Sequence, residues 1–370
     1  MSSFVLPSHD GFSLADVLPG VAARFQGRSG RLPLPEAERY VVFMVDGLGW
    51  EVLETHAADS AFLAPRLGEA AKLTCAVPST TATSLTTLGC GVPPGQHGIV
   101  GYSFKDPQRG RILNALTWEN GPEDVAGFRC APTVYEVLRE TGRESSCVSL
   151  ARFATSGLQQ TAFAGTRFKA VEQESDPETI IPLVQDALAD SCVVYLYERL
   201  LDHDGHAHGV GSWQWLDRLG HVEDLVHALT QSLPDDTALL VTGDHGMVNV
   251  PKQHQIVIED HPGLAGAHLI GGEPRFRQLH TDRPTVLAAA WRKELGDRAE
   301  VWLRDEAIEA GWFGQVSERV RPRIGDVLVA MRQDWAVNTL TRPKEFTLVG
   351  QHGSLTPTEM YVPLFTFGPR

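Results

Sequence analysis

The sequence has few cysteines, and they form no pattern. The five thiols stand at positions 75, 90, 130, 147 and 192, so they are odd in number, and none belongs to a C-x-x-C pair. This spacing argues against a disulfide framework and against a zinc site built on paired thiolates. We therefore expect reduced, mostly buried thiols in a cytoplasmic protein.

Positive charge is also scarce. The chain carries 32 Lys and Arg against 46 Asp and Glu, which gives a formal net charge of −14. An acidic surface repels a phosphate backbone, so long nucleic acid is not an expected partner. A small anionic substrate stays compatible with this charge where bound metal supplies local positive charge.

Long apolar runs are missing as well. The longest uninterrupted ones span about half a dozen residues, far fewer than the roughly twenty of a membrane helix. The N-terminal segment has no basic start followed by a continuous apolar stretch, so no secretory signal is predicted. There is no G-x-x-x-x-G-K-[ST] motif of a P-loop. Neither a membrane partner nor a P-loop site is expected, and the sequence does not indicate an oligomeric state.

What the chain does contain is a regular alternation of short apolar runs and longer amphipathic segments. Helices are predicted at 132–142, 175–190 and 212–233, and the last of them carries one apolar stripe. The alternation predicts an α/β fold with a doubly wound, largely parallel sheet flanked by helices. Five runs are expected to be buried parallel strands: 40–45, 73–77, 146–150, 192–197 and 238–242.

The alternation of apolar runs and amphipathic segments changes after residue 250. A stretch rich in Gly, Pro and His is followed by a compact pattern of helix, strand, helix and strand, near 284–295, 299–303, 304–310 and 325–331. We interpret this part as a small inserted, cap-like α/β subdomain. The predicted domains are a catalytic core at 1–251 and 345–370, to which a last strand near 359–369 returns, and the insertion at 252–344.

Three basic side chains in the insertion are candidates for contact with the phosphate or base of a substrate. They are Arg275, Arg277 and His280. Charged clusters more often lie at the surface, so the interpretation that we favour is a solvated turn.

Acidic and histidine side chains follow the predicted strands. In open parallel sheets, ligands bind outside the carboxyl ends of the strands, which is where these side chains fall. Each one alone has an ordinary explanation as a turn or surface residue. Together they offer mixed nitrogen and oxygen ligands in two sets of three, which is typical of catalytic zinc. The six are Asp46, Asp202, His206, Asp244, His245 and His352.

The stretch VPSTTATSLTT at 77–87 concentrates hydroxyl side chains just after a predicted strand. One interpretation is that Ser79 and Thr80 cap a helix whose polar face carries the other hydroxyls. The alternative is that one hydroxyl is a nucleophile. A threonine hydroxyl is weak at neutral pH, but two divalent ions can activate it and stabilise the leaving oxygen.

The motifs occur in an order that resembles a known family. VDG after the first strand, P-x-x-T near residue 80, HGI, D-x-x-G-H, DHGM and a late HG follow one another between residues 45 and 353. This is similar to the type I phosphodiesterase/nucleotide pyrophosphatase family of the alkaline phosphatase superfamily. The resemblance implies an alkaline phosphatase-like core and two adjacent metal ions, usually zinc. It also implies hydrolysis of phosphodiester or pyrophosphate bonds of a small nucleotide-like substrate through a phosphorylated hydroxyl.

The resemblance also assigns the metal ligands. It implies that one ion is held by Asp202, His206 and His352. It implies that the other is held by Asp46, Asp244 and His245. Because Asp204 and His208 repeat the spacing of Asp202 and His206, that choice rests on the family pattern and not on spacing alone.

The nucleophile of the family lies three positions after the proline, which here is Thr81. Thr81 is therefore predicted both to attack phosphorus and to contact metal. Its neighbours Ser79, Thr80 and Thr83 stay open as alternatives on chemistry alone. Thr81 also begins a predicted helix, whose exposed amides and positive dipole end would face the phosphoryl group.

Two departures from the family pattern affect the substrate. Many diester-cleaving relatives read T-F-P-N-H from the nucleophile, whereas this chain reads T-A-T-S-L at 81–85. Tyr102 stands where relatives carry an asparagine that donates to a phosphoryl oxygen. Either the phenol replaces that donor, or its ring packs over the preceding turn or lines a leaving-group pocket.

Other activities on the same core are a phosphomonoesterase, a phosphonate hydrolase and a phosphate-transferring mutase. A sulfatase is disfavoured because the segment after Cys75 lacks the cysteine spacing and the arginine of that signature. A metal-bound binding or structural protein without catalysis is a further alternative. The full set of ligand-type residues and the hydroxyl argue against it.

Overall fold

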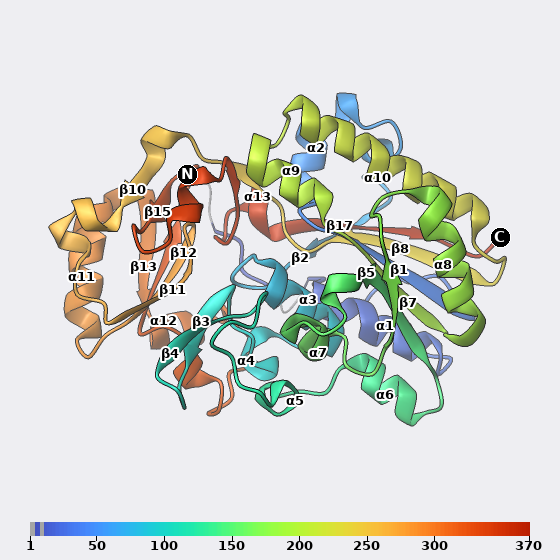
Figure 1. Ribbon diagram of the computed structural model, residues 1–370, viewed down its shortest axis with the longest axis horizontal. Coiled ribbons are helices and arrows are strands. Elements are labelled where there is room, and N and C mark those ends of the chain that lie inside the picture. The colour runs from blue at the N-terminus through green and yellow to red at the C-terminus, as the bar shows by residue number, and fades with distance from the viewer. Residues whose placement is uncertain (1–3, 8–10) are drawn as a thin grey trace.

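A computed structural model describes residues 4–7 and 11–370, so residues 1–3 and 8–10 of the predicted core lie outside the described residues. Its centre is a seven-stranded sheet between two layers of helices (Figure 1). The strand order is β2-β17-β8-β1-β7-β5-β6. These strands are β1 (Arg39–Val45), β2 (Ala71–Thr74), β5 (Ser145–Leu150), β6 (Arg167–Val171), β7 (Val193–Glu198), β8 (Thr237–Gly243) and β17 (Tyr361–Phe367).

Five of these strands pair in parallel, which confirms the predicted fold class. The prediction for 73–77 is wrong in its bounds and in its pairing. β2 ends at Thr74, and its pairing partner in the described chain is β17, which runs antiparallel to both β2 and β8. The apolar run could not reveal this, because its partner comes almost three hundred residues later. β6 was missed because its sequence RFKAV lacks an apolar run.

β1 shows why the sheet is buried on both faces. Its residues alternate between two hydrophobic cores, with Val42 and Met44 in one and Phe43 and Val45 in the other. A strand covered on both faces reads as a continuous apolar run, as this one does. The first core is closed by α1 (Val17–Arg24), α3 (Thr81–Cys90), α6 (Val134–Glu140) and α7 (Gly157–Ala162), and the second by α2 (Trp50–Thr55), α8 (Pro177–Asp190), α9 (Leu200–His208) and α10 (Trp213–Ser232).

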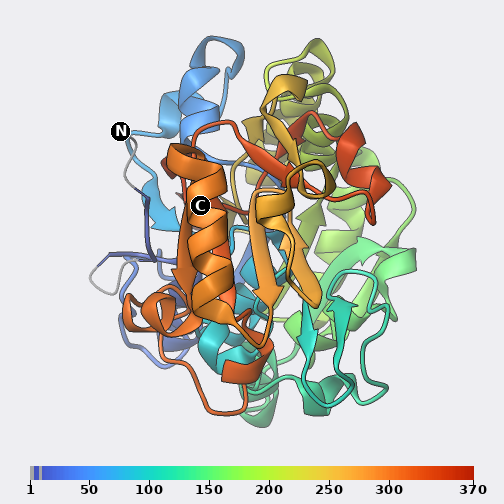
Figure 2. The ribbon, with the colours of Figure 1, turned by 90° about the vertical axis from the view of Figure 1, so that its left-hand side faces the viewer.

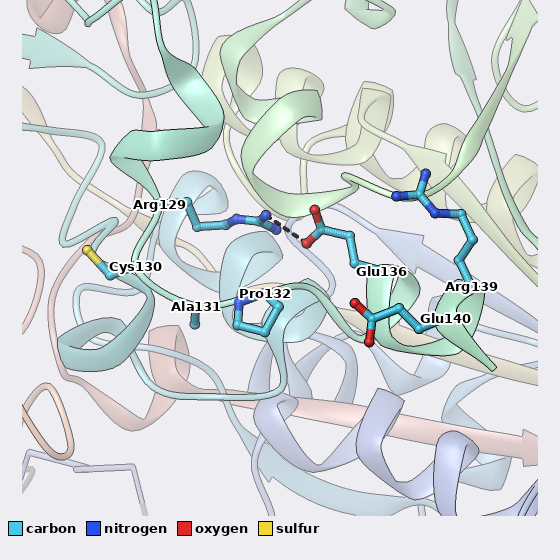
Figure 3. Close-up of a pocket in the computed structure, with 7 residues that line it drawn as sticks. All are labelled: Arg129, Cys130, Ala131, Pro132, Glu136, Arg139 and Glu140. Atoms are coloured by element: carbon cyan, nitrogen blue, oxygen red, sulfur yellow. Dashed lines mark hydrogen bonds and ion pairs between the residues drawn. The ribbon is translucent and has the colours of Figure 1, made fainter.

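The predicted helices are confirmed with small changes at their ends. Asp176 caps α8 and Ser212 caps α10, each accepting a backbone N–H with its side chain. α6 begins later than predicted, because Thr133 caps it in a capping box with Glu136. Figure 3 shows Arg129 bonded to Glu136 beside a small cavity of about 390 Å³ that lies apart from the site described below.

The predicted insertion contains its own four-stranded sheet, with the order β11-β12-β14-β13 and a separate core. α11 packs against this sheet (Figure 2). The division at residues 252 and 344 stays a prediction. The elements here are β10 (Gln255–Val257), β11 (Leu269–Glu273), β12 (Phe276–His280), α11 (Pro284–Leu295), β13 (Ala299–Leu303), α12 (Arg304–Glu309), β14 (Val327–Met331) and β15 (Ala336–Asn338).

Short elements complete the fold. Among the described residues, no helix is both long and apolar enough to cross a membrane. All five cysteines fall in the described part of the chain and none forms a disulfide; three are buried and two are half-buried. The remaining helices and strands are α4 (Pro94–His97), α5 (Val125–Phe128), α13 (Pro357–Met360), β3 (Ser103–Asp106), β4 (Arg111–Asn114), β9 (Val248–Asn249) and β16 (Gly350–Gln351).

The expectation of a solvated turn at Arg275, Arg277 and His280 is wrong. Arg277 and His280 lie on β12 and Arg275 directly precedes it, and all three are buried. Arg275 makes two hydrogen bonds to Glu359, at 2.6 and 2.8 Å, and Arg277 pairs with Glu345. Buried guanidinium groups need such carboxylate partners. Because these partners stand far along the chain, the local sequence reads as a charged surface.

Candidate functional site

The predicted ligands converge at the carboxyl edge of the main sheet. Asp46 directly follows β1, and Asp244 and His245 directly follow β8. Asp202 and His206 occupy the first two turns of α9, the helix that starts two residues after β7. His352 follows β16 and its ring stacks on that of His245, with centroids 3.7 Å apart. Parallel strands bring the segments of Asp46, Asp202 and Asp244 to one edge, as predicted, whereas His352 comes from β16, which pairs antiparallel with β9 outside the main sheet.

The three histidines share one tautomer. Each ring has its Nδ1 at hydrogen-bond distance from a backbone carbonyl oxygen, which can only accept. Nδ1 therefore carries the proton, and Nε2 is left with a lone pair that can bind a metal. The bonds join His206 to Gly350 at 2.7 Å, His245 to Gly246 at 3.0 Å and His352 to Ser79 at 2.8 Å.

The three aspartates each have one buried oxygen without a hydrogen-bond partner in the described chain: Asp46 Oδ1, Asp202 Oδ1 and Asp244 Oδ2. The second oxygen of Asp46 accepts from the Tyr197 hydroxyl, and that of Asp244 accepts from the Gly47 N–H at 3.0 Å. Burial, and then the neighbouring carboxylates, raise the pKa of Asp46, and burial raises that of Asp244. Unpaired buried carboxylate oxygens are costly, so this donor set fits bound cations.

Two groups of three residues each bring their ligand atoms within 4.8 Å of one another. The first is Asp202, His206 and His352, the predicted first set. The second is Asp46, Asp202 and His245, so Asp202 belongs to both groups. Asp244 adjoins the second group, with Oδ2 at 3.5 Å from His245 Nε2, and its predicted role as a ligand stays a prediction.

The alternative pair on α9 lies outside this cluster. Asp204 accepts a hydrogen bond from Arg218 Nε at 3.1 Å, and His208 contacts a glutamine of α10. Neither residue lines the cavity at the site, whereas Asp202 and His206 both do. The helix turns the two pairs to different sides, which spacing alone could not decide.

Thr81 is the first residue of α3, after Thr80 in extended conformation at the N-cap. The helix ends at Gly91, whose φ of +64° suits glycine at a C-cap. Thr81 Oγ1 lies 3.2 Å from His245 Nε2. Its side chain therefore points into the cluster of aspartates and histidines from the positive end of the helix.

The hydroxyls of Ser79, Thr80 and Thr83 do not contact the predicted metal ligands. Ser79 Oγ donates to the Ser354 carbonyl at 2.6 Å, and Thr80 Oγ1 donates to Glu273 at 3.2 Å. Thr83 is fully buried and does not line the cavity. Of these four hydroxyls, Thr81 is the one that contacts a predicted metal ligand.

A cavity of about 930 Å³ opens from the cluster. Four aromatic side chains form one wall of it: Phe153, Phe163, Tyr195 and Tyr197. Tyr102 also lines this cavity. Burial raises the pKa of the Tyr102 hydroxyl, and a hydrogen bond with the Asn114 side chain lowers it to a smaller extent.

Two residues of the site carry no signal in the sequence. Tyr197, which holds Asp46, belongs to an apolar strand and reads as a core residue. Glu273 is buried beside Thr80, and its Oε2 lies 3.7 Å from His352 Nδ1. Burial raises the pKa of Glu273 well above its usual range. It ends a strand in the Gly-rich segment, where no local pattern indicated a site.

The chain is similar to known proteins in sequence pattern and in fold. The model of the family described as type I phosphodiesterase/nucleotide pyrophosphatase matches residues 40–355. A search of curated proteins found no match.

Two sets of solved structures are similar to the chain. Murine ectonucleotide pyrophosphatase/phosphodiesterase 5 superposes with a TM-score of 0.70 at 17% identity, over 90% of this chain and 88% of its own. An inactive variant of that protein, in complex with AMP, gives the same values. The human protein gives 0.69 at 15% identity over the same shares. At such identities the likeness shows the fold, an alkaline phosphatase-like core.

Proposed function

The chain belongs to the type I phosphodiesterase/nucleotide pyrophosphatase family, and on this premise we propose that it cleaves phosphodiester or pyrophosphate bonds of a small nucleotide-like substrate through a phospho-threonine intermediate at a two-metal site. Membership makes it a phosphoric ester hydrolase of a metal-dependent family. The observation that carries the proposal is the 3.2 Å separation of Thr81 Oγ1 and His245 Nε2 inside the ligand cluster. A nucleotide is proposed because a protein of the same fold was solved with AMP.

Two divalent ions fit the residues present. The nitrogen and oxygen donors, the unpartnered carboxylate oxygens and the common histidine tautomer suit zinc. When bound, such ions supply positive charge that stabilises an attacking alkoxide and a departing oxygen. The residues proposed to hold them are Asp202, His206 and His352 for one ion, and Asp46, Asp244 and His245 for the other.

The chain's own groups then position the reaction. Thr81 Oγ1 loses its proton and forms a bond to phosphorus, while the bond from phosphorus to the leaving-group oxygen breaks. Water next attacks the phosphorus of the phospho-threonine and the bond from Thr81 Oγ1 to phosphorus breaks. The product is a phosphate monoester that still carries the other half of the substrate, and Thr81 Oγ1 takes up a proton from the attacking water. The free N–H groups at the start of α3 face the phosphoryl oxygens. The Tyr197 hydroxyl fixes the orientation of Asp46.

An activity profile tests the proposed function. We expect the zinc- or manganese-loaded protein to hydrolyse aryl phosphate diesters and dinucleoside pyrophosphates faster than matched aryl monoesters. The measurement is kcat/KM for each substrate at one pH. A clear preference for monoesters would indicate a phosphomonoesterase, and absence of turnover on every substrate would contradict the proposal.

Tyr102 provides a test of substrate binding. If its hydroxyl donates to a phosphoryl oxygen, Tyr102→Phe removes one donor and costs about 3 kcal/mol of transition-state stabilisation, a hundredfold or more in kcat/KM. Phenylalanine keeps the ring and so isolates the hydroxyl. A variant within about threefold of the wild-type kcat/KM would reject the donor role. In that case, a Tyr102→Ala variant with a higher KM alone would assign the ring to substrate binding.

A further inference from the structure

We propose that Arg199 binds a second phosphate of the substrate, the one joined by a bridging oxygen to the phosphorus that Thr81 attacks. Arg199 thereby favours pyrophosphate bonds over diesters with an uncharged leaving group. This inference rests on the proposed function, since it concerns the same site. It adds a residue outside the predicted ligands and nucleophile.

The first observation is the position of Arg199 on α9. Arg199 is the N-cap residue of this helix, three positions before Asp202 and seven before His206. Positions spaced by three and seven residues share one face of a helix, and all three residues line the 930 Å³ cavity. With a rise of about 1.5 Å per residue, Arg199 stands roughly 4.5 Å along the axis from Asp202. A group one bridging oxygen away from the attacked phosphorus lies within reach of its long side chain.

The second observation is that the Arg199 guanidinium has N–H donors that no described residue accepts. Its ion pair uses Nε, which lies 3.2 Å from Glu174 Oε2. Neither Nη atom forms a hydrogen bond with another residue in the described ranges. A guanidinium offers five N–H donors in a planar fork that suits phosphate oxygens.

The other arginine that lines the cavity makes a useful contrast. Arg342 gives its Nη atoms to backbone carbonyls, at 2.6 Å to Gly272 and 2.7 Å to Ile270. It therefore has less capacity for a ligand than Arg199.

Glu174 holds the guanidinium without satisfying it. The Glu174 side chain is 4% exposed, so it anchors Nε from the protein side. Arg152 and Arg218 add further positive charge around this carboxyl. The Glu198 carboxylate adds negative charge nearby, so the capacity of Arg199 for an anion rests on its Nη donors.

Two substrates that share one half test the inference. Thymidine triphosphate and the para-nitrophenyl ester of thymidine monophosphate carry the same nucleotide. In the intact substrates, the group to be cleaved off is a charged diphosphate in the first and an uncharged aryl group in the second. We expect Arg199→Gln to lower the ratio of their kcat/KM values, triphosphate over ester, by about tenfold or more, as loss of a charge-assisted hydrogen bond predicts. Most of the change should be a higher KM for the triphosphate.

Three further variants separate binding from structure. Arg218→Gln is the matched control, because Arg218 interacts electrostatically with Glu174 but pairs with Asp204 and does not line the cavity, and it should keep the wild-type ratio. Glu174→Gln breaks the ion pair that anchors the guanidinium but keeps Arg199, so it should lower the ratio by less than Arg199→Gln does. Arg199→Lys should recover part of the preference, since lysine keeps the charge without the fork.

A binding measurement makes the inference independent of turnover. In metal-loaded Thr81→Ala protein, ADP should bind more tightly than AMP, and adding Arg199→Gln should remove most of that difference. An unchanged ratio in Arg199→Gln, or an equal loss in Arg218→Gln, would overturn the inference and leave the proposed function standing. A wild-type protein that hydrolyses neither substrate would overturn the proposed function, while ADP and AMP binding would still decide the role of Arg199.

Discussion

Replacement of Thr81 by alanine is expected to remove turnover and to leave metal content close to that of the wild type. Thr81 Oγ1 is the hydroxyl that contacts His245 Nε2, and alanine deletes it without disturbing the start of α3. Loss of a nucleophile lowers kcat by at least about a thousandfold. The measurements are kcat on an aryl diester and elemental analysis of the purified variant.

Two neighbouring threonines provide the controls for that experiment. Thr83→Ala removes a buried hydroxyl that does not line the cavity, and Thr80→Ala removes one that bonds to Glu273. Both variants should keep substantial activity. Mass spectrometry of the acid-quenched wild type should find the phosphoryl group on the peptide that contains Thr81. A near wild-type rate for Thr81→Ala would mean that another hydroxyl or a water molecule attacks.

Removal of metal is expected to abolish activity and to lower the melting temperature. Buried carboxylate oxygens without partners would repel one another in the metal-free protein. A ligand that binds only the folded state stabilises it by mass action. Chelation should therefore lower the free energy of unfolding by on the order of 1–3 kcal/mol, which corresponds to a Tm lower by several degrees. Elemental analysis of protein purified without chelator should give about two divalent ions per chain.

The sense of the pH dependence follows from the ligands. Carboxylates and neutral imidazoles bind metal, so acidification should weaken binding and release the ions. Asp202→Asn should lower the metal content, whereas Asp204→Asn, on the same helix but outside the cavity, should keep it. A metal content near zero, with no activity gained from added zinc or manganese, would contradict the two-metal site.

The parts of this structure that the sequence predicted are those set by local chemistry. β1 is an apolar run because its alternate side chains are buried in two hydrophobic cores. Asp46 comes directly after this strand. The rule that ligands collect at the carboxyl edge of a parallel sheet then placed the acidic and histidine residues in one cluster. The ordered motifs supplied the family and Thr81 as the candidate nucleophile.

What the sequence could not predict depends on partners that lie far apart in the chain. Arg275 reads as a surface residue until Glu359 is seen beside it. The sequence around Tyr197 indicates a core residue, and only the structure shows that its hydroxyl donates a hydrogen bond to Asp46. The membership of Asp202 in both groups of ligand atoms likewise depends on distances that only the folded chain shows. Such contacts leave no periodic signal in a single sequence.

The place of β17 in the sheet also constrains how the enzyme can be made. β17 lies between β2 and β8, so β2 joins the sheet only through a strand that the ribosome produces last among those described. Synthesis proceeds from the N-terminus, and pairings between distant segments form slowly. β2, the strand before the Thr81 segment, therefore leaves the ribosome early, but its place in the sheet is fixed only when residues 361–367 have emerged. The sheet edge beside the proposed site would therefore be completed only at the end of synthesis, when β2 and β17 pair.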